Sequence, residues 1–297
     1  MNNNIKISML GGDRRQLAVA RRLAASYENI KLWGLSAVGE LEGTERARDL
    51  SEALDEADVV ILPLPASADG VRLNAPLGDE GEQVKLSGIA GLIRDGAAVI
   101  GGKLPDSFSR AVSERGAIVK DFFCSEDFQM KNAYTTAEAA LSIAMNSLDK
   151  NIRGSKIAIT GFGRISKHLA ALLLSLGAHV CIAARRESDL SFAESFGCHT
   201  LRISEGAPWW RALTGGYDVI YNTVPYWILG RDFLTEVDKK TFIVDLASAP
   251  GGVDIRAAKE LGSNVSWATS LPGKYAPQSA GEIIADCVMR MISEVSV

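Results

Sequence analysis

The chain has 297 residues, 47% apolar and 23% charged, which is ordinary for soluble globular proteins and enough for about two domains. A formal net charge of -4 without a long basic block argues against nucleic-acid binding. No stretch is typical of a membrane span, and the four scattered cysteines and three histidines indicate reduced thiols in a cytoplasmic protein without a metal site.

The first half of the chain alternates short apolar stretches with segments of helical periodicity. The apolar stretches predict strands at Ile5–Leu10, Ile30–Gly34, Val59–Leu62, Ala98–Gly101 and Ile118–Lys120. Strands that alternate with helices predict a parallel sheet with right-handed crossovers.

A long helix is predicted next, over Thr135–Gly154. Thr135 or Thr136 can cap its first turn, where Glu138 would face the positive end of the helix dipole. Apolar residues then recur at helical spacing. We expect this helix to link two domains.

The second half repeats the plan of the first. Strands are predicted at Lys156–Thr160, His179–Ala183, Val219–Thr223, Phe242–Asp245 and Val265–Ala268. The segment from Lys6 to Ala24 resembles that from Lys156 to Leu174, and two later strands also match in order, which indicates two copies of one α/β plan.

The predicted fold is therefore two Rossmann-like α/β domains with parallel sheets, joined by a long helix, with a ligand cleft between them. Residues 1–134 form the first domain and 135–278 the second, with the linking helix. A last helix, 279–297, is expected to pack back on the first domain.

The turn "TGFGRIS" carries a dinucleotide fingerprint. Gly161 permits the tight turn, Gly163 lets the backbone approach a pyrophosphate, and Ser166 stands at the third position, which needs a small residue. The motif follows a predicted strand and opens a helix, as nucleotide binding requires. The alternative is a purely structural turn.

Two arginines follow the next strand, where an NAD-binding protein usually has an acid. Arg185 and Arg186 can pair with a ribose 2′-phosphate, so the sequence predicts NADP(H) as cofactor. The alternative is that both face solvent. The predicted cofactor-binding residues are Gly161, Gly163, Arg164, Ile165, Ser166, Arg185, Arg186, Thr223, Val224, Pro225, Asp245 and Ala247. For Asp245, a contact to the nicotinamide ribose and a cap on loop amides both remain open.

The first copy departs from this pattern, because Asp13 stands where the second copy has Gly163. A carboxylate there would repel a pyrophosphate. We therefore expect the first domain to have lost dinucleotide binding and to face another ligand.

Six motifs, in order, resemble the dipicolinate synthase A-subunit family over nearly the whole chain: "GGDRRQ", "TTAEAA", "GFGRIS", "NTVP", "DLASAPGGVD" and "LPGKYAPQSAG". The chain departs from the family at Ser166 and Ala139, where glycines are usual. The resemblance implies an NADP-binding subunit that acts in the mother cell during spore formation, with a flavoprotein-like B subunit. Its product would be pyridine-2,6-dicarboxylate, made from the cyclic product of the first condensation of the lysine pathway.

A dicarboxylate substrate needs cationic or N–H donors. Arg15 and Lys274 are the candidates, with Ser67 a weaker one, and Asp13 is the candidate base. The alternatives are an Arg15–Asp13 ion pair and a solvated Lys274.

Two other functions stay open. One is a nucleotide-sensing or scaffolding subunit whose partner performs the chemistry. The other is a generic NADP-dependent dehydrogenase of 2-hydroxy or 2-keto acids, which the absence of a histidine after His199 disfavours. A homo-oligomer is expected in either case.

Overall fold

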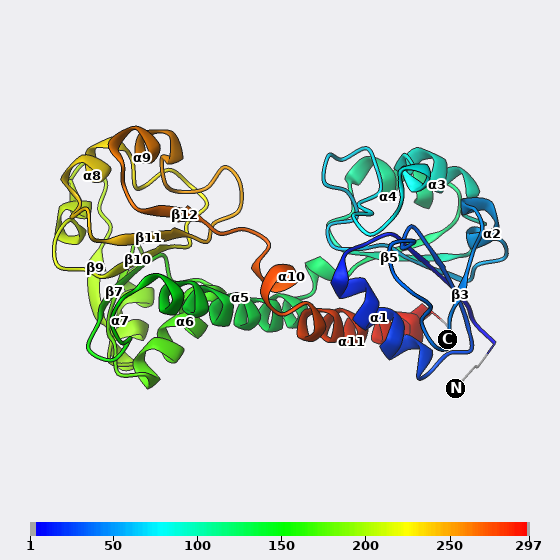
Figure 1. Cartoon of the computed structure of the whole chain (residues 1–297), viewed down its shortest axis with the longest axis horizontal. Coiled ribbons are helices and arrows are strands. Elements are labelled where there is room, and N and C mark those ends of the chain that lie inside the picture. The colour runs from blue at the N-terminus through cyan, green and yellow to red at the C-terminus, as the bar shows by residue number, and fades with distance from the viewer. Residues whose placement is uncertain (1–3, 296–297) are drawn as a thin grey trace. The chain divides into compact units, whose positions relative to one another are not determined.

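The structure is a computed structural model that describes residues 4–295 (Figure 1). It divides into two compact units, Met1–Asn132 with Ala276–Val297, and Ala133–Tyr275. The sequence placed these divisions at 134/135 and 278/279. Residues 1–3 and 296–297, which belong to the predicted first domain, lie outside the described part.

The first unit is built on one parallel sheet in the order β3-β2-β1-β4-β5-β6. Its strands are β1 (Lys6–Leu10), β2 (Asn29–Trp33), β3 (Glu45–Arg46), β4 (Val59–Ile61), β5 (Ala98–Gly101) and β6 (Ile118–Asp121). Its helices are α1 (Arg14–Ala24), α2 (Leu50–Leu54), α3 (Leu86–Leu92), α4 (Asp106–Ser113) and α11 (Pro277–Val295).

The second unit repeats this order as β12-β11-β10-β7-β8-β9. Its strands are β7 (Lys156–Thr160), β8 (His179–Ala184), β9 (His199–Arg202), β10 (Val219–Asn222), β11 (Phe242–Asp245) and β12 (Val265–Trp267). Its helices are α6 (Arg164–Ser175), α7 (Glu187–Ser195), α8 (Arg231–Glu236), α9 (Ile255–Leu261) and α10 (Leu271–Tyr275). The prediction of two Rossmann-like α/β sheets is confirmed.

The repeat extends to the turn after the first strand of each unit. Gly11 has φ +60° and donates its N–H to the carbonyl of Trp33 at 2.7 Å; Gly161 has φ +85° and donates to Ala183 at 2.8 Å. Positive φ is open to glycine without steric cost. The turn after the first strand therefore has the same geometry in both units, at the carboxyl edge of each sheet.

The helix that follows the first sheet in the sequence, α5, corrects the predicted boundaries. It spans Glu126–Ser147 and not Thr135–Gly154. Glu126 and Asp127 lie in its first turn, where carboxylates favour helix initiation. Because the helix begins at Glu126, Thr135 and Thr136 lie in the middle of the helix and not at its start. In the second unit its alanines belong to the core, and Ala140 accepts a hydrogen bond from the Tyr221 hydroxyl at 3.0 Å.

Helix α11 packs against α1 within the first unit (Figure 1). The contact depends on Gly281, because an added Cβ would lie 2.4 Å from the Arg15 carbonyl oxygen and 2.6 Å from the Ala18 Cβ. Neither α11 nor any other helix within residues 4–295 combines the length and apolar character needed to cross a membrane.

Gly281→Ala is expected to destabilise the protein by about 1–3 kcal/mol, because the extra methyl overpacks the α1–α11 contact. Gly91→Ala is the matched control, since Gly91 is helical and its added Cβ would meet nothing within 4 Å. The control should stabilise by about 0.5–1 kcal/mol. Denaturant unfolding measures both, and effects of equal sign would contradict this packing argument.

Candidate functional site

A cavity of about 600 Å³ opens at the carboxyl ends of β7, β8 and β10, where the strand order of the second sheet reverses. Ligands of open α/β sheets bind at this position. It is lined by Gly161, Phe162, Gly163, Ala184, Arg185, Arg186, Asp189, Ile203, Val224, Pro225, Tyr226 and Ile228. Half of the predicted cofactor residues therefore meet here; Arg164, Ile165, Ser166, Thr223, Asp245 and Ala247 do not line it.

The two glycines of the fingerprint differ in their surroundings. Gly161 is required by the chain itself: besides its positive φ, an added Cβ would meet the Thr223 Oγ1 at 2.7 Å and Val224 at 2.9 Å. Gly163 has φ -85°, and an added Cβ would meet nothing within 4 Å. The chain itself therefore leaves open space at Gly163, which fits a group that approaches the backbone from the cavity.

Helix α6 begins at this open space. Gly163 is its N-cap, and no side chain caps the helix. The first turn of a helix presents N–H groups without intrahelical partners, together with the positive end of the dipole. The start of α6 is thus suited to an anionic group such as a pyrophosphate.

Ser166, at the third position of the fingerprint, lies on the inner face of α6 with no exposed surface. Its hydroxyl bonds the Thr223 Oγ1 at 2.8 Å, and Thr223 donates to the carbonyl of Thr160, also at 2.8 Å. In place of the close helix–strand contact that a glycine permits, two hydrogen bonds connect Ser166, Thr223 and the Thr160 carbonyl. It ties α6 to the ends of β7 and β10.

The two arginines after β8 differ in their partners. Arg186 forms a double hydrogen bond to Asp189, with its Nε 2.7 Å from Oδ2 and its Nη2 3.0 Å from Oδ1. This carboxylate raises the pKa of the Arg186 guanidinium. Arg185 is exposed at the cavity, and no hydrogen bond or ion pair engages its side chain within residues 4–295. Arg185 is therefore the arginine available to a ligand.

Asp245 holds the loop after β11. It is fully buried and accepts from the Asn222 amide at 2.7 Å and from the backbone N–H groups of Ala247, Gly252 and Val253 at 3.1, 2.8 and 3.1 Å. Of the two roles that the sequence left open, the structure shows the cap on loop amides.

Asp245→Ala is expected to destabilise the protein by about 3 kcal/mol or more, since each buried donor left without a partner costs about 1–3 kcal/mol. The exposed Asp232, in α8 of the same unit, supplies the control. Asp232→Ala should stay within about 0.5 kcal/mol of the wild type. Equal midpoints of the two variants in denaturant would contradict the bracing role of Asp245.

The corresponding turn of the first unit is already occupied by the chain itself. Asp13 is the N-cap of α1 and accepts from the Arg15 N–H at 3.0 Å. It also accepts from the Arg15 guanidinium, at 3.0 Å from Nε and 2.8 Å from Nη2, and that guanidinium donates to the Leu64 carbonyl. A carboxylate therefore stands at the start of α1, where α6 has open space.

Residues 74–82 cover the rest of that turn and the end of β2. The Gly12 N–H donates to the Asn74 carbonyl at 2.9 Å. Glu82 accepts from the Gly34 N–H at 3.1 Å and from the Ser36 hydroxyl at 2.5 Å. Burial raises the pKa of Glu82, but its hydrogen bonds outweigh this, so the pKa lies below its ordinary value and the group is an anion. The first unit thus places its own carboxylates where a dinucleotide would bind.

The predicted substrate residues are divided between the units. Asp13 and Arg15 pair with each other, as in the alternative that the sequence left open, and Ser67 donates to Asp69 at 3.0 Å. Lys274, predicted in a loop, lies exposed in α10, because Leu271–Tyr275 is helical and α11 follows from Pro277. Roles of these residues in substrate binding stay predictions.

Comparison with known proteins agrees with this fold. The family model of the N-terminal domain of the dipicolinate synthase A subunit matches residues 6–123. The dipicolinate synthase A subunit of Bacillus subtilis strain 168 is 29% identical over 302 residues, covering 99% of this chain and 98% of that protein. The crystal structure of the dipicolinate synthase A subunit from Bacillus halodurans has a TM-score of 0.86 at 26% identity and covers 98% of both chains. Over nearly its whole length the chain is thus similar to dipicolinate synthase A subunits.

A more distant structure has the same fold. The transhydrogenase of Sinorhizobium meliloti is 16% identical, with a TM-score of 0.63 over 96% of this chain and 92% of that one. That likeness shows the fold alone. The similarity to dipicolinate synthase A subunits supports an oxidoreductase-type protein built on this fold.

Proposed function

We propose that this chain is a dipicolinate synthase A subunit that binds NADP(H) in the cavity of the second unit and forms pyridine-2,6-dicarboxylate from a dihydro- or hydroxytetrahydro-dipicolinate. The observation that carries the proposal is the pairing of open space at Gly163 with an unpaired Arg185 at one cavity within the described residues 4–295. The uncapped start of α6 holds the pyrophosphate, and Arg185 holds the ribose 2′-phosphate.

The reaction mainly requires that a ring carbon of the substrate be aligned with the nicotinamide. When bound, the oxidised nicotinamide supplies a hydride acceptor for a substrate ring carbon. A ring carbon of the substrate also loses a proton, and a hydroxytetrahydro substrate loses water as well. Asp13 remains the candidate base, and Arg15 engages both of its carboxylate oxygens. Because the product ring is aromatic, the residues need chiefly to hold the substrate in one orientation.

A second protein completes the proposal. The relatives bear the name of an A subunit, and we infer that this chain also works beside a flavoprotein-like B subunit, in the mother cell of a spore-forming bacterium. The alternative function, a nucleotide-binding sensor or scaffold, differs in leaving the chemistry to that partner.

The purified chain should form NADPH from NADP⁺ when it is given freshly generated cyclic substrate. Asp232→Ala serves as the active control, and Gly163→Asp should be inactive, because its carboxylate would meet the pyrophosphate. NADPH formation that requires addition of the partner protein would favour the scaffold function. Activity with NAD⁺ equal to that with NADP⁺ would contradict the proposed cofactor.

A further inference from the structure

Lys103 lies two residues after the end of β5, at the carboxyl edge of the first sheet. Its backbone has φ +53°, a left-handed conformation that side chains other than glycine rarely adopt. Gly102, the residue before it, is bonded to the loop after β4: its carbonyl accepts from Ala66 at 2.9 Å and its N–H donates to Pro63 at 3.2 Å. The Lys103 turn thus joins the loop that also carries Ser67.

The carboxylate of Asp121 fixes this conformation. It accepts from the N–H groups of Lys103 at 3.1 Å, Leu104 at 2.9 Å and Phe123 at 2.8 Å. Glycine would adopt the same conformation at less cost, and Gly101 and Gly102 stand directly before it. The three hydrogen bonds therefore keep Lys103 in a backbone conformation that is strained for any residue with a side chain.

The Lys103 side chain is exposed, and its ammonium lies 4.5 Å from the centre of the Phe123 ring. Within residues 4–295 no carboxylate is paired with it. The charge of Arg15, by contrast, is satisfied by Asp13 and by a backbone carbonyl, with only 9% of its side chain exposed. Lys103 can therefore bind an anion without breaking an existing ion pair.

We propose that the Lys103 ammonium binds one carboxylate of the substrate and that Phe123 positions this ammonium. The proposal rests on the proposed function, which requires a planar aromatic dicarboxylate as product. A cation beside an aromatic ring suits such a ligand, since the ammonium pairs with the carboxylate and the ring packs against the pyridine. Lys103 takes the role for which the sequence offered Arg15.

The test uses Lys103→Gly in the full-length chain, with pyridine-2,6-dicarboxylate as the calorimetric probe. Removing the ammonium should weaken binding by about 10- to 150-fold, the equivalent of one hydrogen bond to a charge. The melting temperature should not fall, because glycine relieves the left-handed backbone. Affinity for NADPH should stay within about twofold. Lys103→Gln, which keeps the side-chain length, should also lose dicarboxylate affinity, and Lys103→Arg should recover part of it.

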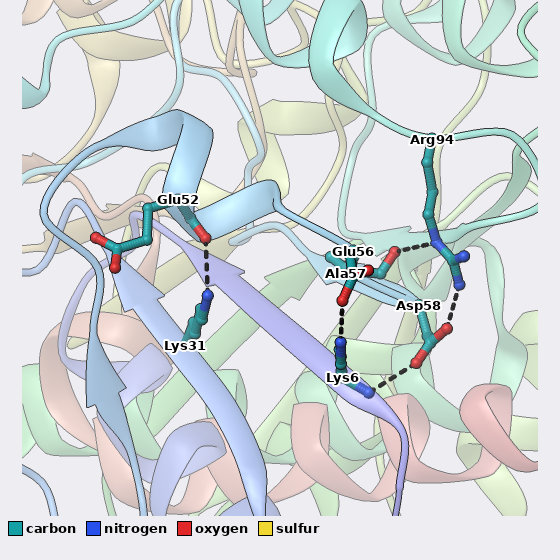
Figure 2. Close-up of polar contacts among 7 residues, drawn as sticks. All are labelled: Lys6, Lys31, Glu52, Glu56, Ala57, Asp58 and Arg94. Atoms are coloured by element: carbon teal, nitrogen blue, oxygen red, sulfur yellow. Dashed lines mark hydrogen bonds and ion pairs between the residues drawn. The ribbon is translucent and has the colours of Figure 1, made fainter.

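Glu56→Gly is the matched control. Glu56 also has a left-handed backbone, φ +52°, but it lies before β4 at the amino edge of the same sheet, where it pairs with Lys6 (Figure 2). It should change the melting temperature as little as Lys103→Gly does and leave dicarboxylate binding unchanged.

The outcomes separate the two proposals. Wild-type affinity in Lys103→Gly and Lys103→Gln would overturn the role of Lys103 and leave the proposed function standing. A wild-type chain that binds NADPH but not pyridine-2,6-dicarboxylate would overturn the role of Lys103 and the dicarboxylate product of the proposed function, and would leave its cofactor standing. Selective loss of dicarboxylate affinity in the Lys103 variants, with Glu56→Gly unaffected, is the result expected.

Discussion

Gly163→Asp is expected to abolish NADPH binding in calorimetry, a loss of about a thousandfold or more. The added carboxylate would enter the open space at the start of α6 and face the pyrophosphate, and like charges in contact cost several kcal/mol. The fold should persist, because an added Cβ would meet nothing within 4 Å and φ is negative. An unchanged melting temperature is therefore part of the expected result.

Asp13→Gly is the counterpart in the first unit. It should leave NADPH affinity within about twofold, because residues 74–82 still cover the turn of that unit. It should lower stability, since it removes the N-cap of α1 and leaves the buried guanidinium of Arg15 without its carboxylate. Normal NADPH binding by Gly163→Asp, with altered binding by Asp13→Gly, would reverse the assignment of the two units.

Arg185→Ala is expected to weaken NADPH binding by about 10- to 150-fold and to change NADH binding little. A charge-assisted hydrogen bond is worth about 1.5–3 kcal/mol, and only NADPH carries the 2′-phosphate. Arg186→Ala should have the smaller effect, because Asp189 already engages that guanidinium. Calorimetry with both cofactors distinguishes the two variants.

The double variant Arg185→Ala/Arg186→Ala should lose only a little more affinity than Arg185→Ala. If Arg186→Ala weakens NADPH binding more than Arg185→Ala does, then Arg186 exchanges its ion pair with Asp189 for the ligand and binds the 2′-phosphate. A parallel fall in NADH affinity would mean that the arginines support the pocket and not cofactor choice.

The strands at the centre of each sheet could be predicted because they are apolar on both faces. The outer strands β3 and β9 were missed. Glu45–Arg46 is polar and exposed, and His199–Arg202 has exposed ends and one apolar residue, Leu201, since an edge strand needs less burial. Their pairing depends on the neighbouring strand and leaves little local signal.

Helix boundaries were harder to predict than strands. The start of α5 was placed nine residues late because Glu126–Asn132 has little apolar periodicity and only its first-turn carboxylates mark the start. Proline and glycine between Leu271 and Pro277 favoured a loop, but proline is tolerated in the first turn of a helix, and Pro277 opens α11.

At the site, Gly161 and Gly163 could be identified because backbone geometry and ligand approach are local requirements. For Asp245 and Arg15 the sequence left two roles open, because it does not show which partners these side chains meet in other loops. The covering of the first turn by residues 74–82 was missed for the same reason: Glu82 meets Gly34 across 48 residues of sequence. Lys103 belongs to no sequence motif, and only its left-handed backbone conformation and the hydrogen bonds of Asp121 around it distinguish it.

The most direct test is titration of NADPH and of NADH into the wild-type chain. If the cofactor binds at the start of α6 and Arg185 binds its 2′-phosphate, NADPH should bind about 10- to 150-fold more tightly than NADH. Equal affinities for the two cofactors would contradict the account.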